Sequence, residues 1–181
     1  MLLFPHRKTL RQASETGSHS GGVKLRDVLT SPSAIIATDF GFGLFPVGPG
    51  TVGSALALPL VWLLSSLNSI ERILVFAVLF PLLVIAAHRA GPVLGEQDHP
   101  SIICDETWAM AVVWESTSDR YGWMVASFLA FRVIDVIKPW PISTVDRSMK
   151  NGLGVMLDDA LAALGAIVFI VATHAIMSVG K

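Results

Sequence analysis

Five apolar stretches separated by polar blocks constrain the fold of this 181-residue chain more than any other feature. They are Val52–Leu67, Ile73–Ala87, Thr107–Trp114, Trp123–Val133 and Ala160–Val179. A helix that crosses the hydrocarbon core of a bilayer needs about 20 apolar residues, and among these stretches only Ala160–Val179 is expected to reach that length. The others reach it only if flanking polar residues lie in the interface or if neighbouring helices shelter them. The pattern predicts an all-α compact bundle of about five or six helices, several of them membrane-embedded.

The composition favours a membrane setting over a soluble one. Hydrophobic residues make up 52% of the chain, charged residues only 15%, and the mean hydropathy is +0.63. A soluble domain carries about 25% charged residues, so we expect lipid to replace water over part of the surface. A tightly packed soluble core is the alternative, because apolar runs of about 10–14 residues are often buried in one.

Charge and cysteine content exclude other classes. The net charge is −1, and no basic stripe alternates with aromatic residues, so we expect no nucleic-acid partner. Cys104 is the only cysteine, which excludes a disulfide framework and a thiolate metal site.

The length fits one helical domain over 31–181. Residues 1–30 form a polar tail with more basic than acidic residues. The apolar start Met1–Phe4 is too short for a signal-peptide core. We expect the tail to be largely disordered and to become helical over Leu25–Leu29, where it approaches the core.

The basic residues predict which side of the membrane the polar blocks face. If all five stretches cross, only Arg72, Arg120 and Lys181 of the thirteen Lys and Arg residues fall on one side, which leaves ten on the other. Basic residues accumulate on the cytoplasmic side. The side with ten also receives all three polar blocks that are rich in acids and glycines, so we expect these blocks to face the cytoplasm.

The first of these blocks, Thr38–Ser54, is a candidate phosphate-binding loop. Its glycines and prolines preclude a regular helix over Gly41–Gly50, and Gly50–Ser54 then opens a helix. Backbone N–H groups, two hydroxyls and a helix N-terminus together can hold a phosphate. On composition alone, a re-entrant turn whose glycines only permit close packing is an equally good interpretation. No Lys follows the glycines, so the block is not a Walker loop.

The second block, Asp98–Glu106, carries three acids. Pro100 suits the first turn of a helix that runs on through Trp114, with Asp105 and Glu106 about 100° apart on it. Carboxylates at the membrane edge of an apolar helix are costly and need a partner. Oxygen ligands alone suit Mg²⁺. His99 is interpreted as solvated and Cys104 as a small buried side chain.

The third block contains three charged residues, Arg132, Asp135 and Lys138, on a helix that Pro139 and Pro141 end. Their i, i+3, i+6 spacing places them along one side of that helix. They form either a salt-bridge ladder of little energetic value or a metal carboxylate flanked by cations that clamp phosphate.

Asp158 and Asp159 close the same block. They follow a predicted turn at Gly152–Gly154 and would head the longest apolar helix. Acids favour a helix N-terminus for capping alone, so capping competes with metal binding as the role of one of the pair.

Together these blocks resemble the phosphatidylglycerophosphatase A family. The family carries similar Pro-Gly-Thr-x-Gly-Ser, Asp-His…Asp-Glu, Phe-Arg-x-x-Asp-x-x-Lys-Pro-x-Pro and Gly-x-Gly-x-Met-x-Asp-Asp segments in the same order. Here they are Pro49–Ser54, Asp98–Glu106, Phe131–Pro141 and Gly152–Asp159. Asp39, Phe42, Pro100, Ala109 and Asn151 depart from the family pattern. None of these removes an acid, although Asp39 adds a negative charge near the candidate phosphate loop.

The resemblance implies a Mg²⁺-dependent phosphatase of the bacterial inner membrane, which converts phosphatidylglycerophosphate to phosphatidylglycerol and inorganic phosphate at the cytoplasmic face. The implied partners are the phospholipid substrate and the membrane; no oligomeric state follows. Catalysis would use Asp105, Glu106, Asp135 and Asp159. The metal ligands would come from Asp98, Asp105, Glu106, Asp135, Asp158 and Asp159. Phosphate would be held by Gly50, Thr51, Gly53, Ser54, Arg132 and Lys138.

Two other classes stay open on the residues alone. One is a non-catalytic membrane protein, such as a carrier whose intramembrane acids bind a cation. The other is a soluble helical phosphatase that acts on a nucleotide or sugar phosphate.

Overall fold

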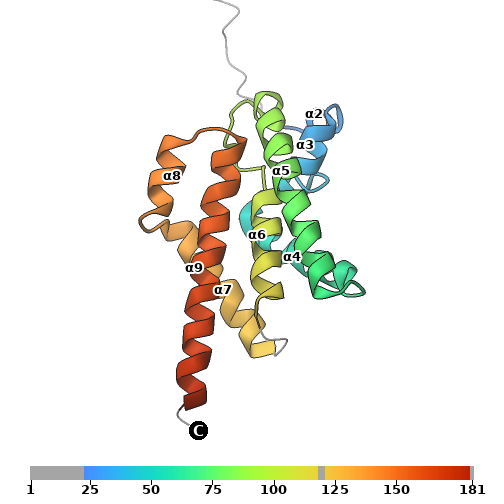
Figure 1. Cartoon of the computed structure of the whole chain (residues 1–181). Helices are drawn as coiled ribbons and strands as arrows, with labels where there is room; N and C mark the ends of the chain where they lie inside the picture. The colour runs from blue at the N-terminus through green and yellow to red at the C-terminus, as the bar shows by residue number, and fades with distance from the viewer. Residues whose placement is uncertain (1–22, 118–120, 180–181) are drawn as a thin grey trace, which may run out of the picture.

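The computed structural model describes residues 23–117 and 121–179, and these residues form helices and loops only (Figure 1). The elements are α2 (Leu25–Leu29), α3 (Pro32–Ala37), the 3₁₀-helix η1 (Phe42–Leu44), α4 (Pro49–Leu64), α5 (Ser69–Leu94), α6 (Cys104–Glu115), α7 (Tyr121–Ile137), α8 (Ile142–Ser148) and α9 (Gly152–Val179). The all-α prediction is confirmed. The described residues contain more helices than expected because α2, α3 and α8, with five to seven residues each, are too short to give a clear apolar period. The helix expected over Leu25–Leu29 is α2.

The five apolar stretches correspond to the five longest helices, α4, α5, α6, α7 and α9. The expectation that only Ala160–Val179 reaches spanning length is wrong, because α5 has 26 residues and is long and apolar enough as well. The Asn68 side chain accepts the Ile70 and Glu71 N–H groups and so caps the start of α5. The helix then continues past its apolar run until Gly95, whose φ of 100° ends it.

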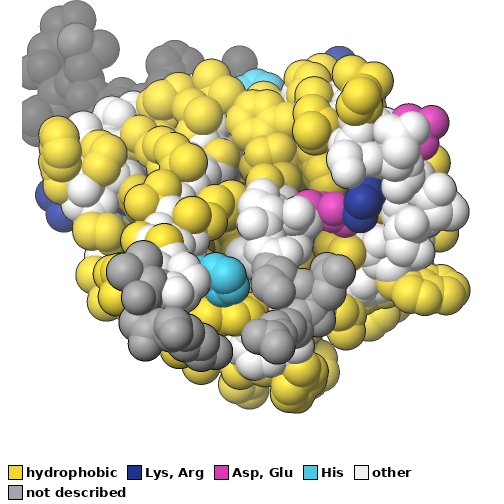
Figure 2. All heavy atoms as spheres, turned by 60° about the horizontal axis from the view of Figure 1, so that its bottom comes forward, with side chains coloured by type: hydrophobic (Ala, Val, Ile, Leu, Met, Phe, Trp, Pro, Cys, Tyr) yellow, Lys and Arg dark blue, Asp and Glu magenta, His cyan; other side chains and the backbone are white. Residues whose placement is uncertain are grey.

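The two long helices α5 and α9 expose most of their apolar surface. Only 17% of the most apolar 18-residue window of α5 is buried, and 22% of that of α9. A core helix of a soluble protein buries most of its apolar residues. Figure 2 shows the end of the bundle drawn at the bottom of Figure 1, where hydrophobic side chains dominate and charged ones lie in isolated places. Length, composition and exposure together favour a membrane protein over the soluble alternative.

Helix α6 lies at the centre of the bundle and packs against α4, α5, α7 and α9 (Figure 1). Small residues allow these close approaches, as is usual between membrane helices. A Cβ added to Gly53 of α4 would lie 2.8 Å from the Ile103 carbonyl oxygen at the start of α6. Alanines on α6 and α9, among them Ala109 and Ala163, fill the core together with Met110 and Phe131.

Each end of the bundle carries an ion pair between residues of different segments. At one end, Arg72 of α5 and Glu115 of α6 form an ion pair with 2.8 Å between Nη1 and Oε2. At the other end, where α5 ends and α9 begins (Figure 1), Lys150 forms an ion pair with Asp98 at 3.2 Å. The second and third polar blocks therefore meet at the same end of the molecule.

The start of α6 differs from the sequence prediction. The helix begins at Cys104, and Pro100 lies in the preceding loop rather than in its first turn. Two hydrogen bonds explain the delay: Ser101 N–H donates to His99 Nδ1 at 3.1 Å, and Ile103 N–H donates to the Ala37 carbonyl at 2.9 Å. The loop is thereby fixed to the end of α3 before α6 begins.

The start of α9 also differs. Gly152–Gly154 are not a turn but the first residues of α9. The reason is tertiary: a Cβ on Gly152 would lie 2.5 Å from the His88 backbone nitrogen, so only glycine lets α9 begin against α5. Asp158 and Asp159 consequently lie beyond the first turn of the helix. An acid at that distance cannot cap the helix N-terminus, so the capping interpretation of this pair is wrong.

Candidate active site

Three carboxylates meet between the first turn of α6 and the third turn of α9. Asp105, Glu106 and Asp159 each offer one oxygen, and these oxygens all lie within 4.8 Å of one another. Asp105 and Asp159 are buried, with 7% and 3% of their surface exposed. The N-terminus of α6 stabilises negative charge in its first turn, but one helix end does not compensate three acids.

Several oxygens of this group lack a hydrogen-bond partner. The buried, unpartnered oxygens among the described acids near the cluster are Asp105 Oδ1, Glu106 Oε2, Asp158 Oδ1 and Asp159 Oδ2. An unpartnered buried charge is strongly unfavourable. Mg²⁺ and Ca²⁺ take carboxylate oxygens as ligands, and here three carboxylates lie close together. Zn²⁺ would favour nitrogen or sulfur ligands. The residues therefore fit a hard divalent cation.

The electrostatics of α6 agree with that fit. Burial raises the pKa of Asp105 well above its usual value, and the charge of Glu106 raises it further. Burial and the neighbouring Asp159 charge raise the pKa of Glu106 to about 8. Without a cation, these buried acids have the lowest free energy when they are protonated. A divalent cation removes that need and keeps them ionised.

Arg132 borders the cluster on the side of α4. Its Nη1 atom lies 2.8 Å from Asp135 Oδ2 and donates to Ser54 Oγ at 3.4 Å. A Cβ added to Gly50 would overlap the Glu106 carboxylate and lie 3.1 Å from Arg132 Nη2. The first turn of α4 therefore approaches Glu106 and Arg132 as closely as a glycine allows.

The other residues of the predicted phosphate loop have different positions. Ser54 is buried and its hydroxyl donates to the Gly50 carbonyl at 2.9 Å, so its hydrogen is already used. Gly53 packs against α6, and its carbonyl accepts the Thr107 hydroxyl at 2.8 Å. Thr51 is exposed. Close packing thus accounts for Gly53, while Gly50 is the residue of this loop that borders the acids.

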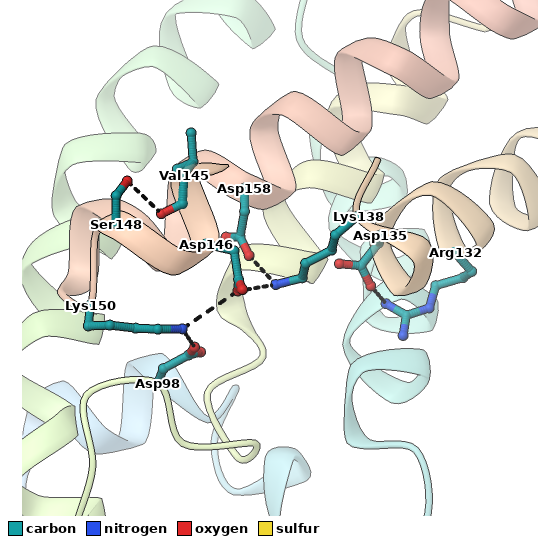
Figure 3. Close-up of polar contacts among 9 residues, drawn as sticks. All are labelled: Asp98, Arg132, Asp135, Lys138, Val145, Asp146, Ser148, Lys150 and Asp158. Carbon is teal, nitrogen blue, oxygen red and sulfur yellow. Dashed lines mark hydrogen bonds and ion pairs between the residues drawn. The ribbon is translucent and has the colours of Figure 1, made fainter. Parts of the chain in front are cut away.

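Lys138 connects the cluster to α8. Its Nζ atom donates to Asp146 Oδ1 at 2.6 Å and also contacts Asp158 Oδ2 (Figure 3). Burial alone would lower the pKa of Lys138, but the two hydrogen bonds outweigh it and the pKa lies above its usual value. The Lys138 hydrogen bond also lowers the pKa of Asp146. Arg132 and Lys138 therefore pair with different acids: Arg132 pairs with Asp135, whereas Lys138 pairs with Asp146 and Asp158.

Two acids singled out in the sequence lie away from the cluster. Asp98 has 49% of its side chain exposed and pairs with Lys150 rather than with the other acids (Figure 3). Asp39 accepts a hydrogen bond from Thr107 on α6, which is about 200° around the helix from Asp105. Burial raises the pKa of Asp39 to about 6, although the Thr107 hydrogen bond partly opposes this. Asp39 thus lies on the side of α6 that faces away from the acid cluster.

Asp146 is a site-adjacent residue that the sequence analysis did not assign. It lies eight positions after Lys138, its hydrogen-bond partner, and Pro139 and Pro141 interrupt any helical register between them. A basic residue followed by two prolines and then an acid carries no recognisable spacing rule, so only the structure brings this pair together.

Comparisons with known proteins show which family the chain resembles in sequence. Residues 35–174 match the family Phosphatidylglycerophosphatase A. The chain is 34% identical over 147 residues to a phosphatidylglycerophosphatase A of Escherichia coli K12, covering 81% of this chain and 86% of that protein. It is 36% identical over 146 residues to one of Haemophilus influenzae, covering 80% and 90%. A provisionally named phosphatidylinositol-3-phosphatase of Bacteroides thetaiotaomicron is 32% identical over 152 residues, covering 75% and 89%. No solved structure shows a significant match.

These relatives define first a class of protein, the phosphatases named for a phospholipid phosphate. The matched segment runs from α3 into α9 and includes the three acids of the cluster together with Arg132 and Lys138. Within that class, the chain belongs to the phosphatidylglycerophosphatase A family. The resemblance noted in the four sequence segments is confirmed.

Proposed function

We propose that this chain hydrolyses the terminal phosphate ester of phosphatidylglycerophosphate and releases phosphatidylglycerol and inorganic phosphate. Family membership over most of the chain supports the substrate. The observation that carries the chemistry is the group of buried acids with unpartnered oxygens beside Arg132. A phosphomonoesterase needs this combination, because it must orient a water and offset the charge of a phosphate.

The proposal includes Mg²⁺ as the cation, held by Asp105, Glu106 and Asp159, with Asp158 and Asp135 next to them. When bound, the cation would orient the attacking water and offset charge on the phosphate oxygens. Arg132 would contribute a planar, permanently charged donor pair to two phosphate oxygens. Lys138 would contribute an ammonium donor.

The remaining steps fall to the acids. A carboxylate of the cluster accepts a proton from water as the water oxygen attacks phosphorus. The bond between phosphorus and the glycerol oxygen breaks, and the proton passes to that oxygen as the alcohol leaves. The buried setting strengthens each of these electrostatic contacts relative to water.

The proposal also assigns the protein to the bacterial inner membrane as a multi-pass protein with its site facing the cytoplasm. The ion pairs of Lys138 and Lys150 lie at the end of the bundle that carries the acids, which agrees with the positive-inside rule. Trp140, between α7 and α8, is 82% exposed and suits an interfacial position. A phosphate on a lipid headgroup would meet the acids at that level.

Phosphate release by the purified protein in detergent micelles tests the substrate. The panel contains phosphatidylglycerophosphate, phosphatidylinositol 3-phosphate, phosphatidic acid and glycerol 3-phosphate. We expect phosphatidylglycerophosphate to give the highest kcat/KM. Preferential phosphate release from phosphatidylinositol 3-phosphate would show that the proposed substrate is wrong, while hydrolysis of a lipid phosphate ester would stand. Release from none of them, with cation binding intact, would support the carrier alternative instead.

A further inference from the structure

The backbone of Lys138 is held in an unusual conformation. Its φ is +45°, in the left-handed region, directly after the end of α7. Glycine is the residue that usually takes this position after a helix, because a side chain is strained there. Strain of this kind persists where surrounding contacts determine it, and it is concentrated at functional sites. The contacts that hold Lys138 are therefore informative.

Two acids from different helices hold the Lys138 ammonium. Asp158 of α9 and Asp146 of α8 each accept one of its donors, the latter at 2.6 Å (Figure 3). An ammonium has three donors, so the described contacts use two and leave one for a phosphate oxygen. Lys150 approaches Asp146 from its other side at 3.8 Å and reaches Asp98 at 3.2 Å. Asp146 is thus the central acid of a chain of alternating charges.

We propose that Asp146 is a positioning residue of the active site, which acts through Lys138; this rests on the proposed function. Lysine has a long, flexible side chain, so a single acceptor does not fix its ammonium. With only Asp158 as acceptor, the ammonium turns fully toward that acid. It then withdraws charge from an acid beside the cation site and moves its third donor away from phosphate. Asp146 shares the ammonium and prevents both changes.

A merely structural role for Asp146 is the competing explanation. Ile142 is the only buried residue of α8, so the ion pairs of Asp146 with Lys138 and Lys150 also help to hold α8 in place. A structural role would lower thermal stability and leave phosphate binding unchanged. A positioning role disappears once Lys138 is gone, because there is nothing left to position.

The test measures binding of inorganic phosphate by calorimetry to the full chain in detergent with Mg²⁺, together with KM and kcat for phosphatidylglycerophosphate. Asp146→Asn is expected to weaken phosphate binding and raise KM by about tenfold, the equivalent of one charge-assisted hydrogen bond. Asp146→Glu, which keeps the charge, is expected to stay within about threefold of the wild type. Lys150→Gln is the matched control: it removes the outer ion pair and leaves phosphate binding unchanged.

A double-mutant cycle keeps the inference falsifiable if Asp146→Asn is unstable. In a Lys138→Gln background, Asp146→Asn is expected to change phosphate binding by less than about twofold, because coupled residues are not additive. Equal effects of Asp146→Asn in both backgrounds, or wild-type phosphate binding by the single variant, would overturn the inference. A wild type that binds phosphate but hydrolyses no lipid would refute the proposed function alone, while the binding cycle would still decide the role of Asp146. A wild type that binds no phosphate would overturn both.

Discussion

Replacing Gly50 with alanine is expected to abolish most of the activity while leaving the fold intact. Gly50 is the second residue of α4, and its φ is not in the left-handed region. Alanine favours a helix over glycine by about 0.5–1 kcal/mol, so the backbone itself accepts the change. The added Cβ, however, would overlap the Glu106 carboxylate and lie 3.1 Å from Arg132 Nη2.

The two displaced groups are the ends of flexible side chains, so they can move aside without unfolding the bundle. We therefore expect the free energy of unfolding to change by no more than about 1 kcal/mol. Activity should suffer far more, because a displacement of about 1 Å at a reacting centre can lower the rate by about a hundredfold. One added methyl group should therefore lower the activity strongly and change the free energy of unfolding only slightly.

The assay compares phosphate release with thermal unfolding followed by tryptophan fluorescence in the same detergent. Gly122→Ala in α7 is the matched control, because a Cβ there meets nothing within 4 Å; its activity should equal that of the wild type. Gly50→Ala with near-normal kcat/KM would refute the reasoning, since Glu106 and Arg132 would then not need their observed positions. Loss of the unfolding transition would mean that Gly50 is a packing glycine only.

Two further predictions concern the acid pair of α9 and the orientation of the chain. At least one of the variants Asp158→Asn and Asp159→Asn should remain folded and membrane-inserted while its activity falls by about a hundredfold or more. We expect Asp159→Asn to lose more activity than Asp158→Asn. Near-normal turnover of both variants at saturating Mg²⁺ would show that neither acid belongs to the site. Val145→Cys in a Cys104→Ala background should react with a membrane-impermeant maleimide only from the cytoplasmic side, and labelling only from outside intact cells would reverse the orientation.

The parts of the fold that the sequence predicts are those with a local signal. Apolar length predicts α4, α5, α6, α7 and α9, and Pro139 and Pro141 mark the end of α7 where the structure has it. The convergence of Asp105, Glu106 and Asp159 follows from the same signal, because their helices begin at one end of the bundle.

Features that depend on tertiary contacts were not predictable. Gly152 has the sequence signal of a turn, and only its contact with α5 explains why it begins a helix. Asp98 has the sequence context of a cluster acid, but its loop is fixed to α3 and turns it toward Lys150. The partner of Lys138 across two prolines, Asp146, has no sequence signal at all.

The central claim is that the buried acids of α6 and α9 hold a divalent cation that phosphate release requires. The most direct measurement is the rate of phosphate release from phosphatidylglycerophosphate after exhaustive chelation with EDTA, followed by titration with Mg²⁺. We expect activity to vanish with the chelator and to return with Mg²⁺, because carboxylate oxygens alone form the site. Full activity after exhaustive chelation would contradict the account.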